Sequence, residues 1–401
     1  MKKLILTLAL VATSALVFGQ KKVVRDAEKD YKKGELESAL TNINMALENA
    51  ETMDDPEVML LKAQIQLKMF GTDSTNTMGN LEVGKGSYES FVSAFEKGGS
   101  DKTDGVGEDI YAEDMLGVPD NLRPYSIFTL KNTAFDKAVE RYNSDDYEMA
   151  YEFFNLAGEV DPSDTTVHYN AGFLANDLGR TEDARKHFNI LLDIPEYNKL
   201  NAYYNLVQIE SAEGNPEAAY DIVQQGREDY PSDKGLAEYE IQLLLQLDKL
   251  DEAMASVKEA LKNDPENTGI LLRSGYLKEQ SGDIEGALAD YKKTVEIDPD
   301  FYEGNYYTGA LMVDRSREIL AELNNLSDEE WEKRSESMGK EANQYYEDAV
   351  PYFERALAQK PEDTNTMIVL FQIHTRLKNE ADAEKYNAKL VELLGPNWME
   401  N

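Results

Sequence analysis

The sequence contains no cysteine among its 401 residues. This absence excludes disulfides, thiol catalysis, thiolate metal ligands and a lipid-modified N-terminal cysteine. Histidine is almost as scarce, and we expect His168, His187 and His374 to have structural roles rather than to bind a ligand. The sequence also has no nucleophile elbow, phosphate-binding loop or H-E-x-x-H motif. We therefore expect no catalytic residue, no metal site and no cofactor.

Basic residues are in the minority. Lysine and arginine number 41 against 77 aspartates and glutamates, which gives a formal net charge of −36. Such a chain repels phosphate backbones and anionic membrane surfaces, so nucleic acid is not an expected partner. The charge favours either simple solubility of a long helical array or the steering of basic partners.

Long apolar runs are missing beyond the N-terminus. There, Lys2 and Lys3 precede an apolar stretch from Leu4 to Phe18, and small residues stand just before Gln20. This order is typical of a secretory signal peptide, and about 15 apolar residues are fewer than the roughly 20 that a membrane-spanning helix needs. We predict a signal peptide at residues 1–19, with an uncleaved anchor as the alternative. The mature chain would be exported without a transmembrane segment, and in a bacterium would be periplasmic, secreted or associated with the outer membrane.

What the sequence does have is regularly spaced alanine. Ala150, Ala184, Ala219, Ala253 and Ala287 follow one another at intervals of 34 or 35 residues. A small residue at this period indicates a helical hairpin that is repeated along the chain.

The unit at residues 163–195 shows the full pattern, with Gly172 in the opening helix, Gly179 at the turn, and Ala184 and Phe188 in the closing helix. We expect the small residue of each opening helix to let the closing helix approach closely. We expect the turn glycine to adopt a left-handed backbone conformation. The pattern resembles that of the tetratricopeptide repeat family. This resemblance implies an all-α solenoid, a superhelix of about nine stacked antiparallel helix pairs, two of which carry insertions.

Two flanking units are irregular. Near the N-terminus we predict an opening helix around Glu57–Phe70, then a loop around residues 71–86, and a closing helix that ends at Ala94 and Phe95. Residues 98–109 are rich in glycine and aspartate, which makes this stretch the best candidate for a flexible boundary.

Near the C-terminus, the closing half of the unit that contains Gly309 arrives late. The intervening residues keep helical periodicity, and a capping box from Ser327 to Glu330 starts a helix through Trp331 and Met338. We read this insert as a helical extension. Its tryptophan and methionine would either anchor a second partner or pack back on the neighbouring hairpin.

The predicted organisation follows from these patterns. It comprises a signal peptide at residues 1–19, an N-terminal repeat pair with an interrupted second repeat at 20–97, a loop or linker at 98–125, a regular central array at 126–300, a repeat with a helical insertion (about 314–342) at 301–361, and a C-terminal capping repeat at 362–401.

The family resemblance implies a concave inner face that is lined by the opening helices. Aromatic and carboxamide side chains alternate along this predicted groove, although some tyrosines would pack between repeats instead. Rings supply contact area, and Asn or Gln can bond the backbone of an extended peptide. The predicted binding residues are Phe135, Tyr142, Tyr169, Asn170, Phe173, Tyr204, Asn205, Gln208, Tyr239, Gln242, Arg273, Tyr276 and Tyr306.

The leading hypothesis is a non-enzymatic adaptor or scaffold of the bacterial cell envelope that holds a peptide or protein segment in this groove. The alternative is a structural or assembly component of an envelope complex that docks through its convex face or its inserted helices. We expect a protein or peptide partner, with no nucleic acid and no small-molecule substrate. Some relatives grip the carboxylates of a partner's C-terminus with basic residues, but Gly235 and Tyr239 stand where that charge is required, so we do not expect such a clamp.

Overall fold

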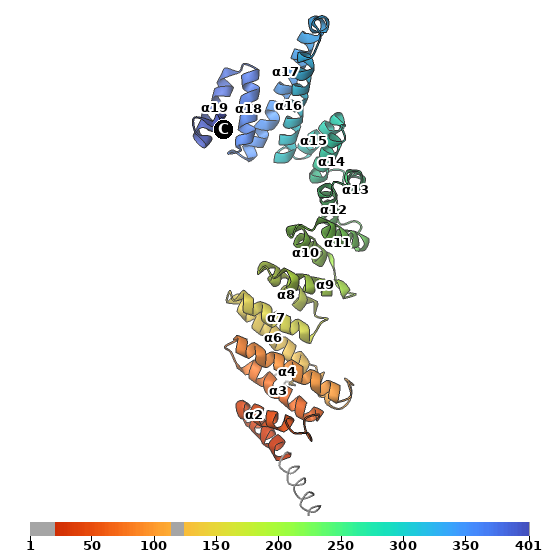
Figure 1. The fold of residues 1–401 in the computed structure, drawn as a ribbon, viewed down its shortest axis with the longest axis vertical. Helices are drawn as coiled ribbons and strands as arrows, with labels where there is room; N and C mark the ends of the chain where they lie inside the picture. Colours follow the sequence, from red (N-terminus) through yellow and green to blue (C-terminus); the bar gives the residue numbers. More distant parts are fainter. Residues whose placement is uncertain (1–20, 114–123, 401) are drawn as a thin grey trace, which may run out of the picture. The chain divides into compact units, whose positions relative to one another are not determined.

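The computed structural model describes residues 21–113 and 124–400, and over these residues the regular elements are helices without any strand (Figure 1). The predicted signal peptide at residues 1–19 lies outside this part. The chain forms two compact units, Met1–Ala212 and Glu213–Asn401, and each is described by itself.

The first unit is a stack of helix pairs, in which each pair packs against the next one along the chain. Its helices are residues 21–33, α2 (Leu36–Leu47), α3 (Pro56–Thr72), α4 (Met78–Lys97), the short α5 (Val106–Ile110), α6 (Ile127–Asn143), α7 (Tyr147–Val160), α8 (Thr165–Asp177), α9 (Thr181–Asp193) and α10 (Leu200–Ala212).

The second unit continues the same arrangement of neighbouring helices. It contains α11 (Pro216–Asp229), α12 (Lys234–Gln246), α13 (Leu250–Asn263), α14 (Thr268–Gln280), α15 (Ile284–Ile297), α16 (Tyr302–Asn324), α17 (Asp328–Gln359), α18 (Thr364–Arg376), α19 (Glu380–Leu394) and the 3₁₀ turn η2 (Trp398–Glu400). Stacked helix pairs of this kind confirm the predicted α-solenoid class.

Glycines set the distance between the two helices of a hairpin. A Cβ atom at Gly275 of α14 would lie 2.4 Å from the Tyr291 ring of α15, and one at Gly309 of α16 would lie 2.8 Å from the Phe353 ring of α17. Both rings are fully buried. The prediction that the small residue admits the closing helix is therefore confirmed, and the aromatic residue of the closing helix is what it admits.

The loop predicted at residues 71–86 is wrong for most of its length. Helix α4 begins at Met78, where the side chain of Thr77 caps it by accepting a hydrogen bond from the backbone N–H of Asn80. The glycines that suggested a loop are helical, and they serve packing instead. A Cβ atom at Gly84 would lie 3.0 Å from side chains of both α3 and α7, so only glycine fits there without a shift.

The stretch at residues 98–125 is not a plain linker where the structure describes it. Helix α5 lies within it, with Val106 and Ile110 buried against the neighbouring helices α3 and α4. Helix α4 also packs directly on α6 and α7, so the irregular stretch does not separate the N-terminal pairs from those that follow. The division between the two units instead falls after Ala212, within the array predicted at 126–300.

The predicted extension consists of the long paired helices α16 and α17. The capping box of Ser327 and Glu330 is present, as predicted. Helix α17 then continues without a break for 32 residues and includes Pro351. The sequence predicts a helix that starts at the capping box of Ser327 and Glu330, and a closing half of the repeat that arrives late. Because no cap or turn interrupts residues 339–348, the two merge into one.

The two apolar residues singled out on α17 differ in environment. Met338 is buried in a small cluster with Ile319 and Ala342, so it packs back on α16. Trp331 is 46% exposed. Only the tryptophan is therefore available for contact with another molecule.

Candidate functional site

One pocket gathers several of the predicted binding residues. It lies in the first unit between α6, α7 and α8 and has a volume of about 330 Å³. We call it the aromatic pocket. None of its lining residues is charged; they are Phe135, Val139, Tyr142, Phe154, Tyr169, Asn170, Phe173 and Leu174.

Helical spacing explains how the pocket is built. Phe135, Val139 and Tyr142 follow one another at intervals of four and three residues, so they form one stripe along α6. Tyr169 and Phe173 form the matching stripe on α8. Both helices begin at side-chain caps, because Ser126 accepts a hydrogen bond from a backbone N–H of α6 and Asp164 accepts two from α8.

The floor of the pocket is rigid and apolar. Phe154 and Leu174 are almost fully buried. The ring of Phe135 meets that of Phe154 edge to face at 5.5 Å, and Tyr169 meets Phe188 in the same way at 6.4 Å. Edge-to-face pairs of this kind restrict ring motion and favour a preformed cavity.

The rim of the pocket, by contrast, exposes apolar side chains. Tyr142 is 46% exposed, Phe173 43% and Val139 37%. Isolated exposed apolar residues are ordinary, but a group of them around a cavity marks a surface suited to contact with another molecule.

The asparagines are less free than the sequence suggested. The side-chain amide of Asn170 donates a 2.8 Å hydrogen bond to the carbonyl of Thr166 in its own helix, and Asn205 donates one of 2.7 Å to Asn201. One of the two N–H donors of each side-chain amide is therefore already bonded to the backbone of its own helix. At Asn170, the remaining donor and the carbonyl oxygen are what could bond to a peptide placed in the pocket.

The other predicted residues do not join this pocket. In the first unit, Tyr204, Asn205 and Gln208 lie on α10, apart from the pocket lining. In the second unit, Tyr239 and Gln242 lie on α12.

On α14, the exposed Tyr276 is near the half-buried Arg273, whose guanidinium donates to the carbonyl of Gly269 in its own helix. Tyr306 on α16 packs edge to face on Phe353 at 5.8 Å. Tyr306 therefore packs against a neighbouring helix, which was the alternative to lining the groove.

Sequence reasoning missed three residues of the pocket: Val139, Phe154 and Leu174. Val139 carried a usable signal, because it lies on the same helical stripe as Phe135 and Tyr142. Phe154 and Leu174 are buried core residues, and periodicity does not reveal that a core residue also borders a cavity.

A buried histidine pair lies between α8 and α9. The Nδ1 atoms of His168 on α8 and His187 on α9 are 3.0 Å apart, so one ring donates a hydrogen bond to the other. Burial lowers the pKa of His168, and burial together with the neighbouring imidazole lowers the pKa of His187 to about 4. Two neutral rings that join α8 to α9 have a structural role, as expected from the sequence.

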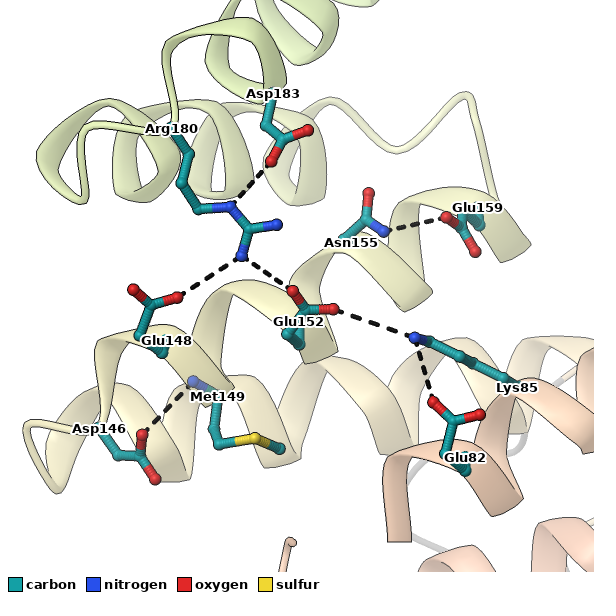
Figure 2. A network of polar contacts seen from close by, with 10 residues as sticks. All are labelled: Glu82, Lys85, Asp146, Glu148, Met149, Glu152, Asn155, Glu159, Arg180 and Asp183. Carbon is teal, nitrogen blue, oxygen red and sulfur yellow. Dashed lines mark hydrogen bonds and ion pairs between the residues drawn. The ribbon is translucent and has the colours of Figure 1, made fainter. Parts of the chain in front are cut away.

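A polar network joins three hairpins of the first unit (Figure 2). Arg180 precedes α9, and its guanidinium nitrogens lie 2.8 Å from a carboxylate oxygen of Glu152 on α7 and 2.8 Å from one of Asp183 on α9. The same guanidinium lies over the ring of Tyr151. Glu152 in turn lies 4.0 Å from Lys85 of α4. Such shared ion pairs fix the register of the hairpins that carry the pocket.

Two broader features of the described residues bear on function. None of their helices is long and apolar enough to cross a membrane. Within residues 21–113 and 124–400 there is also no cluster of three or more histidine, aspartate or glutamate side chains placed to hold a metal ion.

Comparison with solved structures finds many similar chains. One is the C-terminal part of a TPR repeat-containing protein from Cytophaga hutchinsonii, with 13% identity and a TM-score of 0.49, covering 66% of this chain and 98% of that one. Another is PilF of Pseudomonas aeruginosa, with 13% identity, a TM-score of 0.37, and coverage of 67% and 95%. A third, YrrB, is described as a TPR protein with an unusual peptide-binding site; its identity is 22%, its TM-score 0.37 and its coverage 44% and 90%.

No curated protein matches the sequence significantly. A family model for the tetratricopeptide repeat does match, over residues 126–371. The match covers more than half of the chain and includes the aromatic pocket, the histidine pair and most of the second unit. The chain therefore belongs to the tetratricopeptide repeat family.

Proposed function

We propose that this protein is a non-enzymatic adaptor that holds a peptide or protein segment in its aromatic pocket. Stacked helical repeats form extended surfaces for other proteins and need no reactive group for that role. The repeats also occupy most of the chain, which leaves little of it for a separate catalytic domain. The partner is expected to be a protein or peptide rather than nucleic acid or a small-molecule substrate.

The observation that carries this proposal is the group of exposed rings around an uncharged cavity. A cavity of about 330 Å³ is at the small end of the range for ligand sites and suits one large side chain. Aromatic anchors in such pockets dominate the binding energy of many protein interfaces. The amide of Asn170 offers a polar group to the peptide backbone beside that anchor.

Crosslinking and affinity capture with pocket variants test the proposal. Tyr142→Ser and Phe173→Ser remove rim side chains that are already exposed, so the fold should persist. Trp331→Ser is a matched control, because it removes an aromatic side chain of similar exposure from α17. A partner that is crosslinked to the unaltered chain and the control but lost from both pocket variants supports the proposal. A partner that both pocket variants retain contradicts it.

The exposed Trp331 favours one alternative, in which the protein assembles with a partner through the α16–α17 extension. The same experiment separates the two functions. If Trp331→Ser loses the partner while Tyr142→Ser keeps it, the docking surface is the extension.

We also propose export, since residues 1–19 have the order of a signal peptide. The envelope role of the adaptor depends on this step. N-terminal sequencing of the protein recovered from the envelope fraction of the cells that make it should begin at Gln20. Recovery in the cytoplasm of a chain that still begins at Met1 would contradict the proposal.

A further inference from the structure

Helices α6 and α8 run in the same direction along the aromatic pocket. Lys131 near the start of α6 lies 2.9 Å from Asp164, the residue that caps the start of α8. Their C-terminal ends therefore share the opposite side of the pocket. At the N-terminal side this ion pair neutralises the carboxylate of Asp164.

The C-terminal side carries negative charge that is not neutralised. Asp145 follows α6, and its carboxylate accepts a 2.9 Å hydrogen bond from Tyr147, whose ring is 5.4 Å from that of Tyr142. Asp177 ends α8 one turn beyond Phe173, on the same helix face. Both carboxylates are exposed, and neither belongs to an ion pair with any residue in 21–113 or 124–400.

The arginines at this side are already engaged. Arg141 lies 3.1 Å from Asp146 and also donates to the carbonyl of Thr75. Arg180 is held by carboxylates on both sides of it, as Figure 2 shows. The C-terminal ends of α6 and α8 add the negative partial charge of helix termini. The pocket thus has an acidic edge, defined by Asp145 and Asp177, that attracts a positive group.

The spacing within the site sets a pattern for the ligand. Asp177 is four residues from Phe173, which is about 6 Å along a helix axis. In an extended peptide, side chains two residues apart point to the same side and are separated by about 7 Å. We infer that the pocket recognises an extended peptide with a bulky apolar side chain and a lysine or arginine two residues away. This inference rests on the proposed peptide-binding function of the aromatic pocket.

Fluorescence polarisation with short labelled peptides tests the inference. The main probe is Gly-Ser-Phe-Ser-Arg-Ser-Gly, together with its reversed order Gly-Ser-Arg-Ser-Phe-Ser-Gly. One comparison peptide carries Glu in place of Arg, and another carries Ser in place of Phe. At low salt we expect the better of the two Phe–Arg peptides to bind at least tenfold more tightly than the Phe–Glu peptide.

Charge variants of the protein identify the edge that is responsible. The double variant Asp145→Asn and Asp177→Asn should bring the affinities of the Phe–Arg and Phe–Glu peptides within about threefold of each other. The control Glu341→Gln and Glu347→Gln changes the net charge equally, but on α17 in the second unit, and should keep the tenfold preference. If the control loses the preference as well, the effect is general attraction to an acidic protein and the inference is wrong.

The two proposals fail in different ways. If the Phe peptides bind more tightly than the Ser peptide whatever charge accompanies them, the pocket binds apolar side chains and only the inference about basic residues is overturned. If Phe and Ser peptides bind alike, and Phe173→Ser changes nothing, the aromatic pocket is not a binding site and the proposed function fails with it.

Discussion

The buried pair of His168 and His187 makes the first unit sensitive to acid. In the folded chain both pKa values are lowered, that of His187 to about 4, whereas unfolded histidine titrates near 6.5. As the pH falls from 6.5 towards 4, the two histidines are protonated in the unfolded chain but stay neutral in the folded chain. Stability is therefore fully present above about pH 6.5 and is lost as the pH falls through this window. Between pH 7 and 5, His187 alone should remove about 2 kcal/mol.

The charged groups that act on the pair are Asp161, Asp164, Lys186 and Asp183, and the ring of Tyr151 lies 6.1 Å from that of His187. The double substitution of both histidines by phenylalanine removes the titrating rings, and it also removes the hydrogen bond of His168 to the backbone of Pro162 at every pH. Urea unfolding at pH 7 and pH 5 should show a clearly smaller loss of stability in this variant than in the unaltered chain. Equal losses would contradict the prediction, as would NMR titration of the unaltered chain with both rings near pH 6.5.

A second prediction at this scale concerns glycine as a packing residue. Gly275→Ala would place a Cβ atom 2.4 Å from the buried ring of Tyr291. Overpacking of this kind costs about 1–3 kcal/mol. Gly339→Ala on α17 is a matched control, because a Cβ atom there meets nothing within 4 Å and alanine favours the helix by up to about 1 kcal/mol. Thermal unfolding should show opposite shifts, and a stabilised Gly275→Ala would show that the ring moves aside freely.

Helix α17 is unusual among the elements because it is long and yet contains a proline. It has 32 residues and contains Pro351, which lacks a backbone N–H and disfavours a helix interior. Because Pro351 is exposed, Pro351→Ala should restore a backbone hydrogen bond and stabilise the second unit by about 1–3 kcal/mol. Asn343→Ala, also exposed on α17, should change stability by less than about 0.5 kcal/mol. A destabilised Pro351→Ala, measured by urea unfolding, would mean that the proline shapes the helix for packing.

Several element boundaries could be predicted from a cap or a turn residue. The capping box at Ser327 and the turn glycine Gly179, which has φ +72°, both appear as expected. The first part of helix α4, up to residue 86, could not be predicted, because glycine is normally a loop signal and the sequence does not show which neighbours pack against it. At Gly84 those neighbours come from two other helices, α3 and α7, so residue spacing alone could not predict the contact.

At the scale of the molecule, repeat periodicity identified the stacking of hairpins but only part of the candidate site. The pattern placed Phe135, Tyr169 and Phe173 on opening helices, and the structure brings them to one cavity. It did not distinguish them from Tyr306, which packs on its own hairpin. The difference depends on side-chain direction and on the size of the facing residue, which vary between repeats that share the same spacing.

The net charge of −36 gives a final prediction for the whole chain. Repulsion among excess carboxylates disfavours the compact state, while exposed ion pairs each stabilise it by only about 0–1 kcal/mol. Salt weakens both, and at 1 M the screening length falls to about 3 Å. Because acids outnumber bases 77 to 41, repulsion should dominate, and raising NaCl from 20 mM to 0.5 M should increase the urea midpoint of unfolding.

The neutral osmolyte sucrose, at the same osmolality, serves as the control for effects of solute exclusion that do not involve charge. The part of the increase that only NaCl produces should level off once the screening length is shorter than the spacing of surface carboxylates. A midpoint that falls with salt would instead mean that ion pairs such as that of Arg180 with Glu152 outweigh the repulsion. Charge would then stabilise the stacked hairpins through these local networks, and the acidic excess would act mainly on the partners that the protein attracts.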